Sequence, residues 1–245
     1  ISLKGRNRLY RHDLMLLEML AQTNWERPLY MSMTVGKSNY LGSLSDFFVQ
    51  EGLAYRITPF NWKQLGYSGN NAIDEVVVAD TERFYHNVMD RFKFGGLKDN
   101  PDYYVDETTQ RMIHTHRRLL SSLAAQLCAE GKRDKALNVL NLAERELPSS
   151  IVQHEFFSGA EMGRTLIELG ETQKAREILS MIGDEQVEYI NWYAGMSKKT
   201  FERVFNSLRM NIMCLQNIVE VLEAGGKDYQ DLAIKYDKEF ERLYN

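Results

Sequence analysis

The chain has 245 residues, of which 44% are hydrophobic, and its 30 lysines and arginines against 34 aspartates and glutamates give a formal net charge of −4. A chain of this length and composition can bury a sizeable core, which excludes a wholly disordered protein. The mildly acidic balance lacks the basic surplus that binding many phosphates requires, so we expect no nucleic-acid partner. No run of about 18 apolar residues is present, so the sequence predicts no membrane-spanning helix within this chain.

The first part of the chain has the pattern of a small α/β unit, which we place at residues 1–80. Apolar residues at helical spacing predict a helix over residues 6–22, which ends before Pro28. Two β-prone runs, Leu29–Val35 and Leu53–Phe60, predict strands with a short helix between them. With a crossover helix of that size, the two strands could lie parallel in a small sheet.

A stretch rich in turn-forming residues, 61–75, predicts the loop at the boundary between two domains. Val76–Val78 then predicts a short strand. Asp80 or Thr81 is expected to cap a helix that runs to about Phe92. The rest of the sequence has helical patterning almost throughout.

The helical part contains a repeated two-helix pattern. In the first repeat, Ala136 lies where the second helix of a tetratricopeptide unit opens, and Gly131 lies in the turn before it. In the second repeat, Ala175 and Gly170 have the same roles. The two alanines are 39 residues apart, which exceeds the usual repeat of about 34, and the excess falls in Pro148–Val152.

A third helical pair, 201–224 and 227–244, fits the pattern poorly, as the terminal unit of a stack commonly does. Each pair leaves one apolar face that only a neighbouring pair can cover, so the pairs should stack into a short curved layer. The concave side of such a layer generally binds a partner. The sequence therefore predicts a predominantly α-helical α+β protein, with the small α/β unit at 1–80 and a tetratricopeptide-like α-α superhelix at 81–245.

The sequence motifs of common active sites are missing: it has no Gly-rich phosphate loop, no HExxH and no nucleophile elbow. His114 and His116 project about 200° apart around a helix, so they cannot share a metal. Cys128 and Cys214 lie in apolar helical stretches, where we interpret them as small hydrophobic residues. Asp106–Glu107 precede a helix, which favours a role at its N-terminus over a catalytic pair. We expect no catalytic residue, metal or cofactor in this chain.

One region is richer in aromatic and polar residues than a scaffold requires. The candidate ligand-binding or partner-binding residues are Trp25, Arg27, Tyr30, Tyr40 and Arg56. Aromatic faces beside amide, carboxylate and guanidinium groups can hold a sugar or a polar peptide by stacking and hydrogen bonding. In the alternative interpretation, which we favour, Trp25 and Tyr30 anchor the small sheet. An arginine of the set then pairs with Glu26 or Glu51.

Four segments in this part of the chain carry a family resemblance: Asn24–Tyr30, Asn39–Gly42, Glu51–Arg56 and Thr81–Met89. They resemble the C-terminal region of large bacterial membrane proteins. The many-span N-terminal part of those proteins resembles lipid-linked-sugar glycosyltransferases of the protein O-mannosyltransferase type. The resemblance extends across about residues 6–148, and beyond it the similarity is to helical repeats in general.

The resemblance implies that this chain, which begins at Ile1 rather than at a methionine, is the tail of a longer membrane protein. In such proteins the catalytic acids belong to loops of the membrane part, so the resemblance assigns no catalytic residue here. The tail is expected at the periplasmic face of the inner membrane. Its expected partners are an acceptor polypeptide or another protein and the membrane-spanning part of the same protein, with a glycan as a further candidate.

Two functions from different classes are compatible with these patterns. The first is a non-catalytic domain of a membrane glycosyltransferase-like protein that holds an acceptor polypeptide or a partner. The second is a tetratricopeptide-type interaction scaffold with no role in glycosyl transfer, whose working surface is the concave side of the helices.

Overall fold

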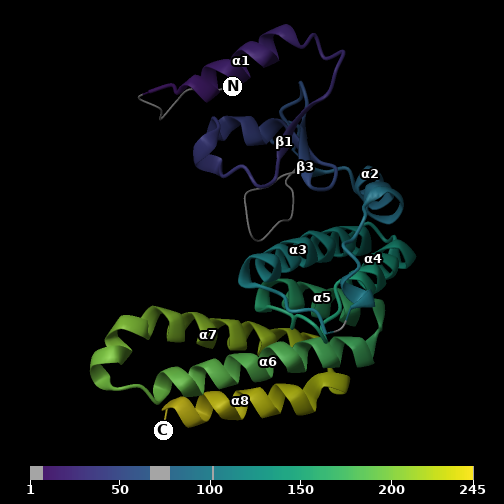
Figure 1. Cartoon of the computed structure of the whole chain (residues 1–245). Helices are drawn as coiled ribbons and strands as arrows, with labels where there is room; N and C mark the ends of the chain where they lie inside the picture. Colours follow the sequence, from purple (N-terminus) through teal and green to yellow (C-terminus); the bar gives the residue numbers. More distant parts are fainter. Residues whose placement is uncertain (1–7, 67–77, 101, 245) are drawn as a thin grey trace. The chain divides into compact units, whose positions relative to one another are not determined.

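The computed structural model describes residues 8–66, 78–100 and 102–244, and the chain divides into two compact units (Figure 1). The first unit ends at Lys93 and the second begins at Phe94. The sheet belongs to the first unit, and the regular elements described in the second unit are helices. The predicted fold class, a predominantly helical α+β protein with its sheet in the N-terminal part, is confirmed.

The first unit combines a four-stranded sheet with short helices. Its elements are α1 (Arg11–Gln22), β1 (Leu29–Ser32), the 3-10 helices η1 (Lys37–Asn39) and η2 (Gly42–Phe47), β2 (Phe48–Gln50), β3 (Ala54–Ile57), β4 (Val78–Ala79), α2 (Thr81–His86) and the π-helix η3 (Asn87–Arg91). The strand order in the sheet is β1-β3-β2-β4. Strand β3 is antiparallel to both β1 and β2, and β4 is parallel to β2.

The two predicted strands correspond to β1 and β3, and the parallel pairing suggested for them is wrong. The reason is that a further strand, β2, precedes β3. The segment expected to be a crossover helix forms η2 and then β2. Strand β2 turns directly into β3 through Gly52, whose φ of 135° favours glycine. Strand β3 therefore returns antiparallel to β2, and its other edge pairs with β1, with Tyr30 opposite Arg56.

The core of the first unit lies between α1, the sheet and the segment before β2. Its fully buried members are Tyr40, Leu44, Phe48 and Ile57. Leu16 and Leu20, one turn apart on α1, pack against them, as the apolar periodicity predicts. The Phe48 ring contacts the Tyr40 ring at a centroid distance of 5.5 Å. Burial of these rings supplies much of the stabilisation of a small unit, since an aromatic side chain contributes roughly 1.5–3 kcal/mol.

Helix α2 begins at the predicted cap. The Asp80 carboxylate accepts a hydrogen bond from the Arg83 backbone N–H at 3.1 Å. The helix continues as η3 to Arg91, and the Asn87 side-chain amide donates to the Glu51 carbonyl at 2.7 Å. This bond ties the helix to the β2–β3 hairpin. Helix α2 thus belongs to the first unit, whereas the sequence pattern grouped it with the later helices.

Parts of three predictions fall outside the described residues, and the first is the start of the predicted helix over 6–22, at residues 6 and 7. The predicted loop at 61–75 lies outside them from residue 67 onwards, as do the first two valines of the predicted strand Val76–Val78. The third valine, Val78, begins β4, so this part of the predicted strand is confirmed.

The second unit is a stack of antiparallel helices. Its elements are η4 (Leu97–Asp99), α3 (Glu107–Ala129), α4 (Arg133–Glu146), α5 (Phe156–Leu169), α6 (Thr172–Ala194), α7 (Lys198–Ala224), η5 (Lys227–Tyr229) and α8 (Gln230–Tyr244). Each helix from α3 to α8 packs on the next one, α3 also packs on α5, and α6 also packs on α8. Asp106 caps α3 by accepting backbone hydrogen bonds from Thr108 and Thr109, which confirms its predicted place at a helix N-terminus.

The two predicted helix pairs, α3–α4 and α5–α6, are present. Gly131 and Gly170 lie between the helices of each pair with φ of 76° and 78°, the left-handed conformation that glycine adopts at low cost. Ala136 and Ala175, which open the second helix of each pair, are fully buried. The other buried residues of these pairs include Leu120, Leu123, Ala124, Leu127, Leu140, Ala143, Met162, Leu166 and Leu179.

Glycines allow α6 to approach both α5 and α8 closely. A Cβ added at Gly163 of α5 would lie 2.6 Å from Cδ2 of Leu179 on α6. A Cβ at Gly183 of α6 would lie 2.5 Å from the ring of Tyr236 on α8. Both distances are shorter than van der Waals contact, so the packing of α5, α6 and α8 depends on these residues having no side chain.

Candidate binding sites

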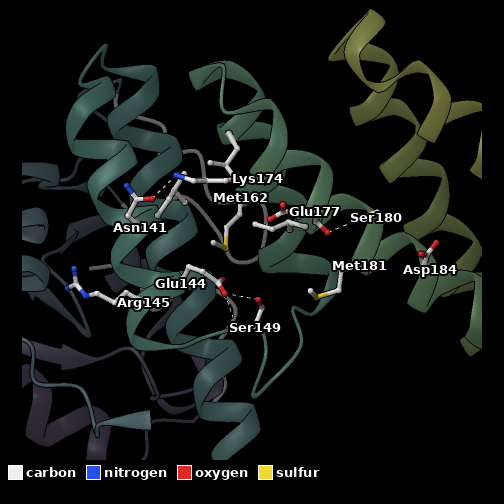
Figure 2. A pocket seen from close by; sticks show the side chains of 13 residues that line it. Asn141, Glu144, Arg145, Ser149, Met162, Lys174, Glu177, Ser180, Met181 and Asp184 are labelled. Carbon is white, nitrogen blue, oxygen red and sulfur yellow. Dashed lines mark hydrogen bonds between the residues drawn. The ribbon is translucent and has the colours of Figure 1, made fainter. Parts of the chain in front are cut away.

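A groove of about 760 Å³ runs between α4 and α6 in the second unit, with α5 beneath it (Figure 2). Its base is apolar and consists of Leu140, Met162, Leu166, Ile178 and Met181. Polar side chains from the two flanking helices form its rims: Asn141, Glu144 and Arg145 from α4, and Lys174, Glu177 and Asp184 from α6. An apolar base with a few polar groups, in a volume between about 300 and 1,000 Å³, is typical of ligand-binding clefts.

Hydrogen bonds fix the rims of the groove. Across it, the Lys174 ammonium donates to the side-chain oxygen of Asn141 at 3.0 Å. At its end, the Glu144 carboxylate accepts from the Ser149 backbone N–H at 2.9 Å and contacts His154 Nε2 at 3.2 Å. Burial alone would raise the pKa of Glu144, but the bonds from His154 and Ser149 outweigh it and hold this pKa at about 2. Glu144 is therefore ionised at neutral pH.

The connection between α4 and α5 is built around a buried arginine. The Arg117 side chain on α3 is 0% exposed, and its guanidinium donates to the carbonyls of Leu147, Val152 and Gln153 at 2.8, 2.6 and 2.8 Å. Burial lowers the pKa of Arg117 to about 10, and Glu144 and Glu155 partly offset this effect. The guanidinium stays charged. Its bonds fix the long connection, which places Ser149 at the groove and His154 beside Glu144.

Arg117, Glu144 and His154 are not among the candidate residues that the sequence predicted. The only signal for them was indirect, because the extra residues at Pro148–Val152 form a connection with carbonyls outside regular helix, and such carbonyls need donors. Arg117 lies three residues before the buried Leu120 and therefore on the apolar face of its helix. An arginine in such a position is a candidate donor to these carbonyls. Residue spacing alone could not show which carbonyls it would reach.

The buried His154 makes the stability of the second unit depend on pH. Burial lowers the pKa of His154, and Arg117 adds to this effect, while the bond to Glu144 opposes it. A group whose folded-state pKa is lowered stabilises the fold above its unfolded pKa, here about 6.5, and this stabilisation is lost as the pH falls. The pKa of Glu144 is lowered from 4.5 to about 2, so Glu144 also stabilises the fold at neutral pH. This stabilisation is lost at lower pH than that of His154.

We therefore expect the free energy of unfolding, measured with urea, to fall from pH 7 to pH 5. In the variant His154→Gln, the amide can still donate to Glu144 but does not titrate, so this fall should be smaller. The control is Ser150→Gln in the same connection, which changes no titrating group and should keep the wild-type dependence. An equally steep fall in His154→Gln would contradict the assignment.

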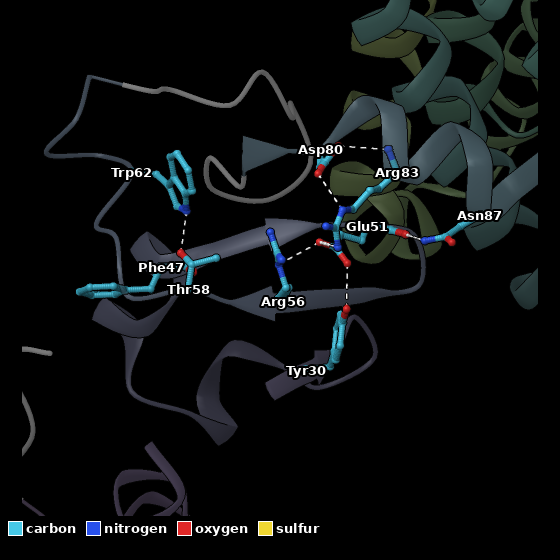
Figure 3. A network of polar contacts seen from close by, with 9 residues as sticks. All are labelled: Tyr30, Phe47, Glu51, Arg56, Thr58, Trp62, Asp80, Arg83 and Asn87. Carbon is cyan, nitrogen blue, oxygen red and sulfur yellow. Dashed lines mark hydrogen bonds and ion pairs between the residues drawn. The ribbon is translucent and has the colours of Figure 1, made fainter. Parts of the chain in front are cut away.

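In the first unit, a buried carboxylate joins the sheet to α2 (Figure 3). Glu51 is only 7% exposed. Its Oε2 accepts a hydrogen bond from the Tyr30 hydroxyl at 2.9 Å, and its Oε1 lies 2.9 Å from Arg56 Nε and 3.4 Å from an Arg83 guanidinium nitrogen. These three residues come from β1, β3 and α2, so the network compensates the buried charge and holds three elements together.

The charges of this network balance one another. Arg83 also pairs with Asp80 at 3.4 Å, so the two arginines face two carboxylates. Burial and the neighbouring Glu51 raise the pKa of Tyr30, which keeps its hydroxyl a donor at neutral pH. The ion pair between Arg56 and Glu51 is one of the pairs that the alternative interpretation of the sequence left open, with Arg27 or Arg56 pairing with Glu26 or Glu51. We conclude that the network stabilises the fold.

The five candidate residues chosen from the sequence do not converge on one site. Tyr30 and Arg56 meet at Glu51, as described above. Tyr40 is 5% exposed and packs in the core, so its ring is not presented to a ligand. Trp25 and Arg27 lie in the exposed turn between α1 and β1, where Trp25 has a φ of 61°. A left-handed conformation at a bulky residue is strained, and the Trp25 side chain is exposed.

The described residues hold no group suited to bind a metal ion and no activated thiol. Among them, no three His, Cys, Asp or Glu side chains are grouped to hold a metal ion. Both cysteines are free thiols, and burial raises the pKa of Cys128 and brings that of Cys214 to about 11. Neither is therefore a thiolate at neutral pH. No helix in the described part of the chain has the length and apolarity needed to cross a membrane.

Comparison with known families gives one match. Residues 1–77 match the family model described as TMEM260-associated domain 2. The match fits a domain of a larger membrane-associated protein. It includes three of the segments that carry the resemblance noted in the sequence, Asn24–Tyr30, Asn39–Gly42 and Glu51–Arg56. No curated protein and no solved structure matches the chain.

Proposed function

We propose that this chain is a non-catalytic domain of a membrane glycosyltransferase-like protein and that it binds a polypeptide, either the acceptor or a partner protein. The match of residues 1–77 to a domain named for a transmembrane protein supports an origin in a membrane protein. The resemblance of the same region to tails of glycosyltransferase-like membrane proteins supports the glycosyltransferase-like character of that protein. In this proposal the chain lies at the periplasmic face of the inner membrane, and the catalytic residues lie in the membrane part.

The observation that carries the binding role is the groove between α4 and α6. Its apolar base can take up an apolar side chain, and the polar groups on both rims can hydrogen-bond to a peptide backbone. The Glu51 network offers less, because Tyr30, Arg56 and Arg83 already surround its buried carboxylate. We therefore place polypeptide binding in the groove rather than at Trp25, Arg27, Tyr30, Tyr40 and Arg56.

A second candidate function is a tetratricopeptide-type scaffold without a role in glycosyl transfer. The close packing of the helix pairs α3–α4 and α5–α6 favours it, because such pairs commonly present binding surfaces. The two functions differ in one measurable respect. Variants that close the groove should reduce glycosyl transfer by the full-length protein if the groove holds the acceptor, and should leave transfer unchanged if the chain is only a scaffold.

The groove can be tested with a random peptide library displayed on phage and selected against the whole chain. We expect selected peptides to contain apolar residues and to bind Met181→Glu at least about tenfold more weakly, because the new carboxylate lies on the apolar base. Fluorescence anisotropy with labelled peptides measures this change. The matched control is Met112→Glu, at an exposed methionine of α3. Equal affinity for both variants would rule out the groove.

A further inference from the structure

The end of the α6–α7 hairpin carries an exposed aromatic cluster. We call residues 189–205 the hairpin end. Its aromatic residues are Tyr189, Trp192, Tyr193, Phe201 and Phe205. Trp192 is 60% exposed and Phe205 is 50% exposed. The rings form two contacting pairs, Trp192 with Tyr193 at 4.9 Å and Phe201 with Phe205 at 5.9 Å. In each pair one ring, Trp192 or Phe205, is exposed and the other is half-buried, and exposed apolar area gathered in this way marks an interaction surface.

The lengths of the helices explain why these rings are exposed. Helix α5 has 14 residues, whereas α6 has 23 and α7 has 27. At a rise of 1.5 Å per residue, α6 continues for roughly 13 Å beyond the part that pairs with α5. Figure 1 shows the α6–α7 connection at one end of the helical unit, away from α5. The hairpin end is therefore presented at an edge of this unit.

The hairpin end is basic although the chain as a whole has a net charge of −4. Its sequence contains Lys198, Lys199 and Arg203 but only one carboxylate, Glu202. Even when Glu188, the residue before it, is included, cations remain in the majority. Lys199 and Arg203 are exposed, so positive charge lies in the same short segment as the exposed rings. This combination complements a surface that is negatively charged and has an apolar layer beneath it.

We propose that the hairpin end docks onto the surface of an anionic lipid bilayer. Tryptophan and tyrosine rings favour the headgroup region, where an apolar ring and a polar edge are both accommodated. Lysine and arginine beside them are attracted to anionic lipids. The docking goes beyond the proposed function, and it does not depend on whether the groove binds a polypeptide.

The test is sedimentation of the whole chain with lipid vesicles. We expect binding to vesicles of phosphatidylcholine with one-third phosphatidylglycerol, weaker binding to phosphatidylcholine alone, and weakening as salt screens the charges. The variants Trp192→Ala with Phe205→Ala, and Lys199→Glu with Arg203→Glu, should each reduce the partition constant by roughly tenfold or more.

The controls make comparable changes elsewhere in the unit. Tyr104→Ala removes another exposed ring, and Lys227→Glu with Arg133→Glu reverses one lysine and one arginine charge on η5 and α4. Both controls should bind vesicles like the wild-type chain. The proposal is overturned if the wild-type chain does not bind anionic vesicles or if the hairpin-end variants bind as well as the controls. Self-association that requires Trp192 and Phe205, without vesicle binding, would instead assign this surface to a second copy.

Discussion

Replacing Arg117 by methionine is expected to lower the free energy of unfolding of the second unit by about 3–5 kcal/mol. Methionine fills part of the space but cannot donate, so the carbonyls of Leu147, Val152 and Gln153 lose their buried partner. For a unit of this size, the loss corresponds to a fall in Tm of roughly 10 °C. Differential scanning calorimetry of the whole chain measures this change.

The matched control is Arg111→Met on the same helix. Arg111 is exposed and pairs with Glu107 one turn away at 3.1 Å, a surface pair that contributes only about 0.3–0.5 kcal/mol. Arg117→Lys should give an intermediate loss, because the ammonium keeps the charge but not the planar set of donors. A change in Tm no larger in Arg117→Met than in Arg111→Met would show that the connection does not depend on Arg117.

The second large effect is expected for Gly183→Ala, which should lower the free energy of unfolding by about 1–3 kcal/mol. Alanine at an internal helix position normally stabilises by about 1 kcal/mol relative to glycine. Here its Cβ would meet the buried ring of Tyr236, which cannot move aside without disturbing the hydrogen bonding of its hydroxyl. That single O–H is shared between two acceptors, the Ser180 carbonyl at 3.0 Å and Asp184 Oδ1 at 2.9 Å. Urea unfolding measures the effect.

A double-mutant cycle identifies the cause of this loss. Tyr236→Ala alone is destabilising because it leaves a cavity, but it removes the ring that the new Cβ meets. Adding Gly183→Ala in that background should therefore cost little or should stabilise. Gly195→Ala, at the end of α6 where a Cβ has ordinary contacts only, is the control and should be close to neutral. Additive effects of the two substitutions would contradict the steric explanation.

Much of the fold could be predicted because its signals are local. The caps at Asp80 and Asp106 act on N–H groups two or three residues away, so sequence spacing alone identifies them. The repeat around Gly131 and Gly170 is visible for the same reason, since each turn requires a left-handed residue at a fixed distance from its helices. Helical periodicity also identified the buried faces.

The binding sites could not be predicted as well, because they depend on contacts between distant residues. Arg117 meets carbonyls 30–36 positions away, and Glu51 meets Tyr30 21 positions away and Arg83 32 positions away. The candidate set at Trp25, Arg27, Tyr30, Tyr40 and Arg56 was chosen by residue type and closeness in sequence. The pairing of β1 with β3 brings Tyr30 and Arg56 together at Glu51. Tyr40 instead packs in the core of the first unit.

The sequence by itself thus determined the caps, the helix pairs and the faces that they bury, because these follow from backbone preferences and apolar spacing within a few residues. Only the tertiary structure decided the antiparallel return of β3, the partners of Glu51 and Arg117, the groove between α4 and α6, and the exposure of the α6–α7 hairpin end. Each of these depends on which distant segments meet, and the pairing of distant segments is a property of the whole packed chain rather than of any local pattern.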